Sequence, residues 1–183
     1  MFRYLLRKPG GLPEVPPGNR AFSSHRNSPV LALLAVLCLA VVIETFALHL
    51  LVGRWSRPAA WILTSVSVYS LLFLFAHGRA ISLKPHLVAA DHLRIRDGLL
   101  WSADVPLDRI TAVDRGEKAG EHRKDALTVT TLTAGNMAVT IDGGVDCRGP
   151  YGIRRRFETV RFFADDPEEL EASLQCTNMT PKD

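Results

Sequence analysis

The sequence predicts an α+β membrane protein, in which a two-helix transmembrane hairpin precedes an antiparallel β-sandwich or partly open barrel with a C-terminal capping helix. Three observations favour this fold class. Two apolar runs are separated by a short loop, about seven short strand patterns follow them, and the spacing of apolar residues then becomes helical. Because 47% of the 183 residues are hydrophobic and 22% are charged, disorder along the whole chain is excluded.

The charge distribution divides the chain into a basic first part and a mildly acidic second part. Residues 1–79 contain eight of the 22 Lys and Arg residues but only two of the 19 Asp and Glu residues. The second part therefore lacks the basic excess of a nucleic-acid-binding domain, and no nucleic acid is expected as a partner. The three cysteines suit neither a disulfide framework nor a metal knuckle, and no cofactor or metal is expected.

Residues 1–29 are predicted to form a flexible, basic leader. Five prolines and three glycines precede Val30, a composition typical of an irregular segment. The five Lys and Arg residues of this leader favour the cytoplasmic side of a membrane and contact with anionic headgroups.

The two apolar runs occupy residues 30–52 and 60–76 within a hairpin region of residues 30–77. As helices they are about 35 Å and about 26 Å long, which suits a hydrocarbon core of about 30 Å. The first run is too long for a signal peptide and is interpreted as a retained anchor. Only residues 53–59 join the two runs, so the helices must be antiparallel. Basic residues on both flanks favour two spans with the N- and C-termini in the cytoplasm.

Glu44 is the costly residue of the first apolar run, because it lies near the middle of the predicted span. At the matching depth of the second run lie Thr64 and Ser65, and a hydrogen bond across the hairpin is expected to satisfy the carboxyl group. An alternative interpretation makes Glu44 the functional group of a small transport or proton-coupled subunit. His49 lies 140° around the helix from Glu44, and the two are not expected to pair.

Residues 81–175 carry the strand patterns of the β-domain, and residues 176–183 form a tail. Asp97-Gly98 is a strong hairpin signal, and further turns are predicted at residues 134–136 and 142–144. The predicted strands lie at residues 86–90, 92–96 and 99–105, near Ile110, from Leu127, at residues 137–141, and at residues 154–163.

A helix is predicted to begin at residues 166–169. Asp166 suits the N-cap, Pro167 the first helical position, and Glu169 the third position of a capping box. Leu170 and Leu174 then share one face, which is expected to pack on the sheet.

This order of elements, with the segment VPLDRITAV and the terminal DDPEELEASL helix, resembles the bacterial pleckstrin-homology-like domain, which often follows one or two transmembrane helices. The resemblance covers residues 81–175. It implies a strongly bent seven-stranded sheet plugged by the helix, a prokaryotic plasma (inner) membrane, and a membrane-associated binding or assembly module without enzymatic activity. Lipid-binding relatives use a lysine and an Arg-x-Arg pair, which correspond here to Lys84, Arg94 and Arg96.

Other candidate sites carry weaker patterns. The run Arg154, Arg155 and Arg156 favours contact with headgroups or with a partner, or else keeps an exposed strand soluble. His86, Asp91 and His92 have no recognised metal-ligand spacing, and Cys147 has no identifiable base beside it. No motif of a known catalytic class is present in the sequence, so no enzyme is expected.

Three functions follow as hypotheses. The first is a membrane-anchored module that binds a partner protein or a second copy of itself through the sheet edge, the loop of residues 114–125 and the basic last strand. The second is a sensor of anionic lipid headgroups. The third is the transport subunit that depends on Glu44.

Overall fold

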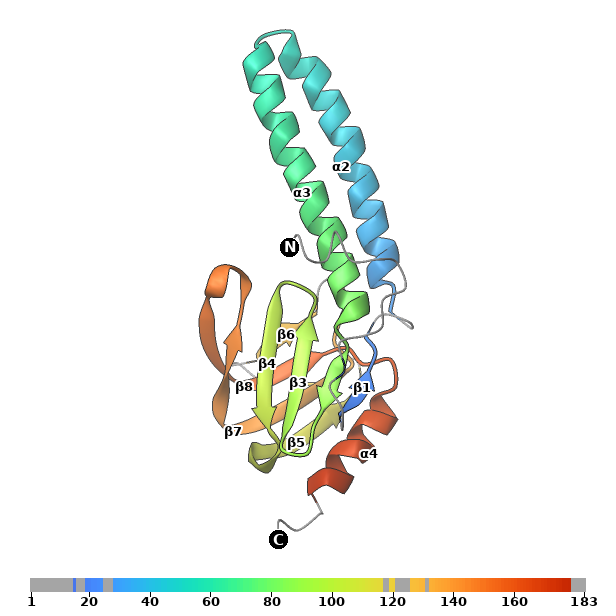
Figure 1. Ribbon diagram of the computed structural model, residues 1–183, viewed down its shortest axis with the longest axis vertical. Coiled ribbons are helices and arrows are strands. Elements are labelled where there is room, and N and C mark those ends of the chain that lie inside the picture. Colours follow the sequence, from blue (N-terminus) through green and yellow to red (C-terminus); the bar gives the residue numbers. More distant parts are fainter. Residues whose placement is uncertain are drawn as a thin grey trace.

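The computed structural model describes residues 15, 19–24, 28–116, 119–120, 126–130 and 132–178. Most of the predicted leader, part of the loop of residues 114–125 and the end of the predicted tail lie outside these residues. The described part forms an elongated molecule in which a helix pair projects from one end of a sheet domain (Figure 1).

Two long antiparallel helices, α2 (Val30–Gly53) and α3 (Arg57–Leu83), pack along each other. Both are long and apolar enough to cross a membrane. Ser56 precedes α3 and accepts a hydrogen bond from the backbone N–H of Ala59 (3.4 Å), and Pro58 occupies the first turn, where its missing N–H costs nothing. The predicted helical hairpin is confirmed at this level.

Helix α3 ends seven residues later than the predicted run, at Leu83 in place of Ala76. Residues 77–83, which lie beyond the predicted apolar run, continue the helix because its buried side packs against the sheet domain. His77, Ala80 and Ile81 are buried where α3 meets the sheet domain. The helix pair and the sheet domain are therefore joined by an uninterrupted helix.

The domain is an open eight-stranded sheet with the path β1-β2-β3-β4-β7-β8-β6, and β5 pairs with β7 beside this path. The C-terminal helix is α4 (Pro167–Asn178), which begins where the capping pattern predicts. The strands are β1 (Arg20–Phe22), β2 (His86–Val88), β3 (His92–Asp97), β4 (Trp101–Pro106), β5 (Ile110–Arg115), β6 (Ala126–Val129), β7 (Met137–Arg148) and β8 (Arg154–Phe162).

Strand β1 was not predicted, since its residues were assigned to the flexible leader. It pairs antiparallel with β2, and its side chains and the following loop bind the region of α4. Arg20 donates to the hydroxyl of Ser173 (3.1 Å), and Ser23 donates to the carboxylate of Asp165 (2.5 Å). These long-range contacts order a segment whose local composition indicates no structure.

Two predicted hairpin turns are wrong. Residues 142–144 do not reverse the chain, because β7 continues through them with a register shift between Thr140 and Val145. Gly143 and Gly144 adopt φ values of +64° and +70° there, which produces a bulge and a bend. The turn at residues 134–136 does not pair β6 with β7 either, since β6 runs parallel to β8.

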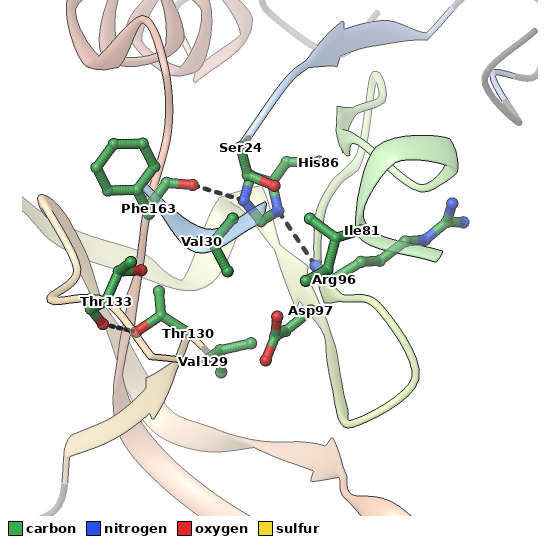
Figure 2. A pocket seen from close by; sticks show the side chains of 10 residues that line it. All are labelled: Ser24, Val30, Ile81, His86, Arg96, Asp97, Val129, Thr130, Thr133 and Phe163. Atoms are coloured by element: carbon green, nitrogen blue, oxygen red, sulfur yellow. Dashed lines mark hydrogen bonds between the residues drawn. The ribbon is translucent and has the colours of Figure 1, made fainter. Parts of the chain in front are cut away.

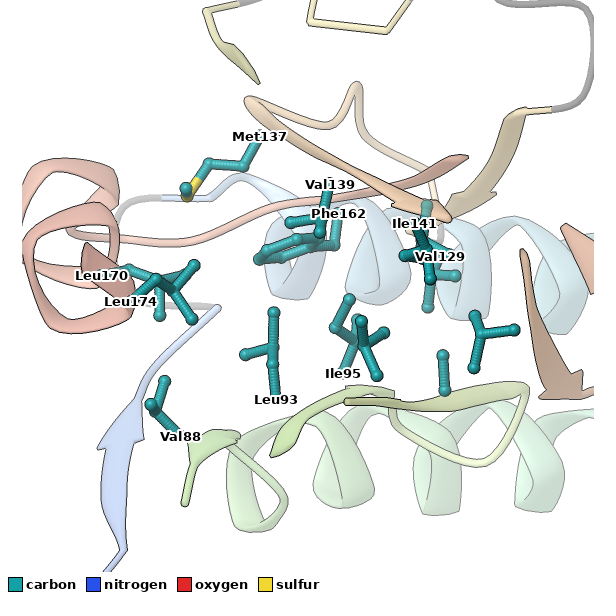
Figure 3. Packing of buried hydrophobic residues seen from close by; sticks show 14 of the residues in the cluster. Val88, Leu93, Ile95, Val129, Met137, Val139, Ile141, Phe162, Leu170 and Leu174 are labelled. Atoms are coloured by element: carbon teal, nitrogen blue, oxygen red, sulfur yellow. The ribbon is translucent and has the colours of Figure 1, made fainter. Parts of the chain in front are cut away.

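The core lies between the two arms of the bent sheet (Figure 3). Leu93 and Ile95 on β3 face Val139 of β7 and Phe162 of β8, and all four side chains are fully buried. Leu170 and Leu174 of α4 close one end of this core, as their spacing predicts.

Candidate functional site

The predicted headgroup residues do not form one cluster. Arg94 pairs with Asp104 across β3 and β4, so its charge is neutralised on the exposed sheet face. Lys84, directly after α3, donates to the carbonyl of Gly98 (3.5 Å), and Arg96 lines a small cavity near the same turn. Arg154, Arg155 and Arg156 lie apart from these, on β8.

The three β8 arginines are exposed, and the structure adds a fourth basic residue to them. Arg148, at the end of β7, pairs in register with Arg154, while Arg155 lies opposite Cys147. Arg156 donates to the carbonyl of Gly143 in the β7 bulge (2.8 Å). The sequence pattern missed Arg148 because the chain was expected to turn at residues 142–144, and only a continuous β7 brings Arg148 opposite the basic run.

The hydrogen bond predicted between Glu44 and the polar residues Thr64 and Ser65 of the second helix is not formed. Thr64 hydrogen-bonds with His49 Nδ1 (2.7 Å) and also donates to the carbonyl of Ala60. Ser65 donates to the carbonyl of Trp61 in its own helix (2.9 Å). Glu44 is exposed on the outer surface of α2 and makes no hydrogen bond or ion pair with the residues that the structure describes.

The junction between the helix pair and the sheet domain is built around the β3–β4 turn. The backbone N–H of Leu99 donates to His77 Nδ1 (3.2 Å), and the His77 ring stacks on Phe73 at 6.2 Å. Gly98, with φ at +49°, lies so close to α3 that a Cβ atom there would be 2.6 Å from His77 Nδ1. The turn predicted at Asp97-Gly98 is confirmed, and its glycine also permits contact with α3.

A cavity of about 20 Å³ lies beside this junction, between the two helices and the sheet (Figure 2). Its volume suits a single water molecule. Val30 and Ile81 line it from the helices, and His86, Arg96 and Asp97 line it from the sheet. The cavity is therefore a polar packing junction and is too small for an organic ligand.

His86 is fully buried with both ring nitrogens in hydrogen bonds (Figure 2). Nε2 donates to the carbonyl of Phe163 (2.9 Å), and Nδ1 accepts from the backbone N–H of Arg96 (3.1 Å). This arrangement fits the neutral ring only. Burial lowers the pKa of His86 from 6.5 to about 4; the Phe163 carbonyl and Asp165 oppose this shift, and Arg96 adds to it.

The sheet domain is therefore expected to lose stability in acid. Because the folded pKa lies below the unfolded value, the unfolded chain binds more protons as the pH falls from 6.5 to about 4. The stability present above pH 6.5 should decrease by about 3 kcal/mol across this interval. Denaturant unfolding at several pH values measures it. His86→Gln should flatten the pH dependence, whereas His92→Gln should retain it; an unchanged slope in His86→Gln contradicts the assignment.

The weaker sequence candidates are not assembled into a site. Both nitrogens of His86 are engaged, and His92 pairs with Asp91 (2.5 Å) on the surface. No cluster of three or more metal-ligating side chains occurs in the described part of the chain. Cys147 is fully buried in β7, and burial together with nearby Asp146 raises the pKa of its thiol to about 11, so it is a poor nucleophile.

No family model, curated protein or solved structure matches this chain.

Proposed function

We propose that the protein is a membrane-anchored binding module without enzymatic activity, which binds a partner protein or a second copy of itself at the cytoplasmic face of a prokaryotic plasma membrane. In this proposal both α2 and α3 cross the membrane, both chain ends lie in the cytoplasm, and the sheet domain is pleckstrin-homology-like. The bent sheet and the C-terminal helix that closes one end of its core support a pleckstrin-homology-like domain.

The exposure of the helices supports the membrane anchor. Only 11% of the most apolar window of each helix is buried, whereas a core helix of a soluble protein is mostly buried. Large apolar side chains such as Phe46 (68% exposed) and Ile62 (65%) cover the outside of the pair. Contiguous exposed apolar side chains of this kind mark an interaction surface, and a bilayer would cover them.

The observation that carries the binding role is the outward position of Glu44. Ionisable residues within membrane helices face a bundle interior or a polar cavity, because hydrocarbon solvates them poorly. Here α3 leaves Glu44 uncovered, and Ala40 and Ala47 lie on the same face of α2, four residues before and three residues after it. Small residues beside a polar group allow another helix to approach closely. A helix of the partner or of a second copy would cover this face within the membrane, and it would hold the bound protein beside the cytoplasmic sheet domain.

Site-specific photo-crosslinking in native membranes tests this function. A photoreactive residue at Ala47 should capture one defined protein, while the same residue at Phe46, 100° away around α2, should capture lipid. At Thr111, exposed on β5, it should capture the protein found at Ala47. Capture of lipid alone at Ala47 and nothing at Thr111 overturns the proposal, and capture of a second copy identifies self-association.

Two substitutions of Glu44 test its role in assembly. Glu44→Gln retains a hydrogen-bonding group and should preserve the adduct at Ala47. Glu44→Leu should reduce it about fivefold, since an interhelical hydrogen bond in a membrane contributes ~1 kcal/mol. An unchanged adduct in Glu44→Leu contradicts a role in assembly.

A further inference from the structure

The described residues of the sheet domain expose two large apolar side chains, Leu132 (49%) and Ile153 (47%). Packing among the described residues explains neither position. Leu132 also has φ at +62°, a conformation that costs energy in a residue with a side chain. An apolar residue held outward in a strained loop suggests a surface that is covered in the working protein.

Both residues lie in loops at the end of the sheet from which the helices project. The β7–β8 tip consists of residues 149–153, between the two strands, and contains Ile153. Because Ser102 of β4 pairs with Arg148 of β7, this tip extends toward the same end of the sheet as the β3–β4 turn. That turn touches α3 through Leu99 and His77. Figure 1 shows the β7–β8 hairpin rising on the helix side of the domain.

The loop that contains Leu132 also lies at the helix-side end of the sheet, as a different observation shows. Thr130 and Thr133, on either side of Leu132, line the junction cavity together with Val30 of α2 and Ile81 of α3. Leu132 therefore lies in a loop next to the first residue of α2.

Basic residues surround the β7–β8 tip. Arg148 and Arg154 face each other across the hairpin, and Arg155 follows. All three side chains are exposed, and none of them forms an ion pair or side-chain hydrogen bond with the described residues. Like charges placed directly opposite each other are unfavourable unless an anionic surface compensates them.

The tip is also held in place by the domain. Gly149 lies beneath Trp101, where a Cβ atom would be 2.7 Å from the indole ring, and Trp101 packs edge-on against Phe157 at 6.5 Å. The hairpin therefore presents Ile153 and the arginines from a supported position.

We propose that the β7–β8 tip and the loop of Leu132 dock on the anionic surface of the membrane that holds α2 and α3. Ile153 and Leu132 enter the headgroup region, and Arg148, Arg154 and Arg155 contact lipid phosphates. This inference rests on the proposed membrane anchor and adds a fixed orientation of the sheet domain. With its helix-side end on the lipid, the domain turns β5 and α4 away from the membrane.

Lipid photo-crosslinking of the full chain in vesicles tests the docking. The vesicles contain phosphatidylcholine with 30% phosphatidylglycerol or phosphatidylcholine alone, and the photoreactive residue replaces Ile153, Leu132, Phe46 or Asp108. Asp108 lies at the opposite end of the sheet, beyond the His92–Pro106 pair. Lipid adducts at Ile153 and Leu132 should exceed those at Asp108 at least tenfold in the anionic vesicles.

Charge variants test the arginines. The double variant Arg154→Gln, Arg155→Gln should weaken docking in anionic vesicles. The ratio of docked to undocked protein, measured from the lipid adducts at Ile153, should decrease about fivefold for each arginine removed. The control pair Arg94→Gln with Arg115→Gln removes the same charge from residues already paired with Asp104, Glu168 and Glu171, and it should have no effect.

The two proposals fail in different ways. Adducts at Phe46 with none above background at Ile153 and Leu132 overturn the docking and leave the anchor intact. The absence of adducts at Phe46 as well overturns both. Equal losses in the two charge variants overturn the assignment to the β7–β8 tip.

Discussion

Replacing Gly98 with valine should destabilise the sheet domain by about 4 kcal/mol, because two costs combine at this position. The backbone has φ at +49°, where a β-branched residue is strained by about 1–3 kcal/mol. The added Cβ would lie 2.6 Å from His77 Nδ1 and 2.9 Å from Ile81 Cγ1, and overpacking of this kind costs about 1–3 kcal/mol. Denaturant unfolding in detergent, followed by near-UV circular dichroism, measures the loss.

Gly116→Val is the matched control for Gly98→Val. Gly116 also has a positive φ, at +106°, but nothing lies within 4 Å of its added Cβ. It should therefore show the backbone cost without the collision. If both variants lose the same stability, the contact of the β3–β4 turn with α3 is not important for folding. Faster proteolysis near Lys84 in Gly98→Val alone would show that the domain separates from α3.

Replacing Phe162 with alanine is expected to cost about 4 kcal/mol as well, through loss of burial and the cavity that remains. Phe162 is fully buried between the arms of the sheet, and its ring lies edge-on to His86 at 5.1 Å. Domains of this kind are stable by only about 5–15 kcal/mol. The variant should unfold at much lower denaturant concentration in the same assay.

Phe163→Ala provides the comparison for Phe162→Ala, because the neighbouring side chain points to the other side of the chain and is only half-buried. Its backbone carbonyl, which accepts from His86, is retained. A loss of about 1 kcal/mol is expected there. If both variants lose the same stability, the assignment of Phe162 to the core side of this segment and of Phe163 to the other side is wrong.

Several features of the fold could be predicted because they depend on neighbours in sequence. The length of each apolar run determines that the helices can span a membrane. The Asp97-Gly98 turn and the start of α4 at Pro167 depend on backbone preferences and on caps within a few residues. The inward positions of Leu93, Ile95, Leu170 and Leu174 follow from the strand and helix periods.

The remaining features were decided by partners far away in the chain. Gly143 and Gly144 suit a turn or a bulge equally well, and pairing with β4, β5 and β8 selects the bulge. Strand β6 pairs in parallel with β8, and β1 forms because β2 and α4 are present to bind it. The local sequence pattern cannot predict the bulge, the parallel pairing or β1, because the competing conformations differ only in their tertiary contacts.

The same division applies to the candidate sites. The sequence by itself identified Glu44 and the β8 arginines as unusual, because charge in an apolar run and dense basic charge are visible without a fold. Only the tertiary structure paired Thr64 with His49, left Glu44 on the outer surface, and brought Arg148 opposite Arg154. Residue chemistry is local, whereas the surface that a residue faces depends on which distant elements pack beside it.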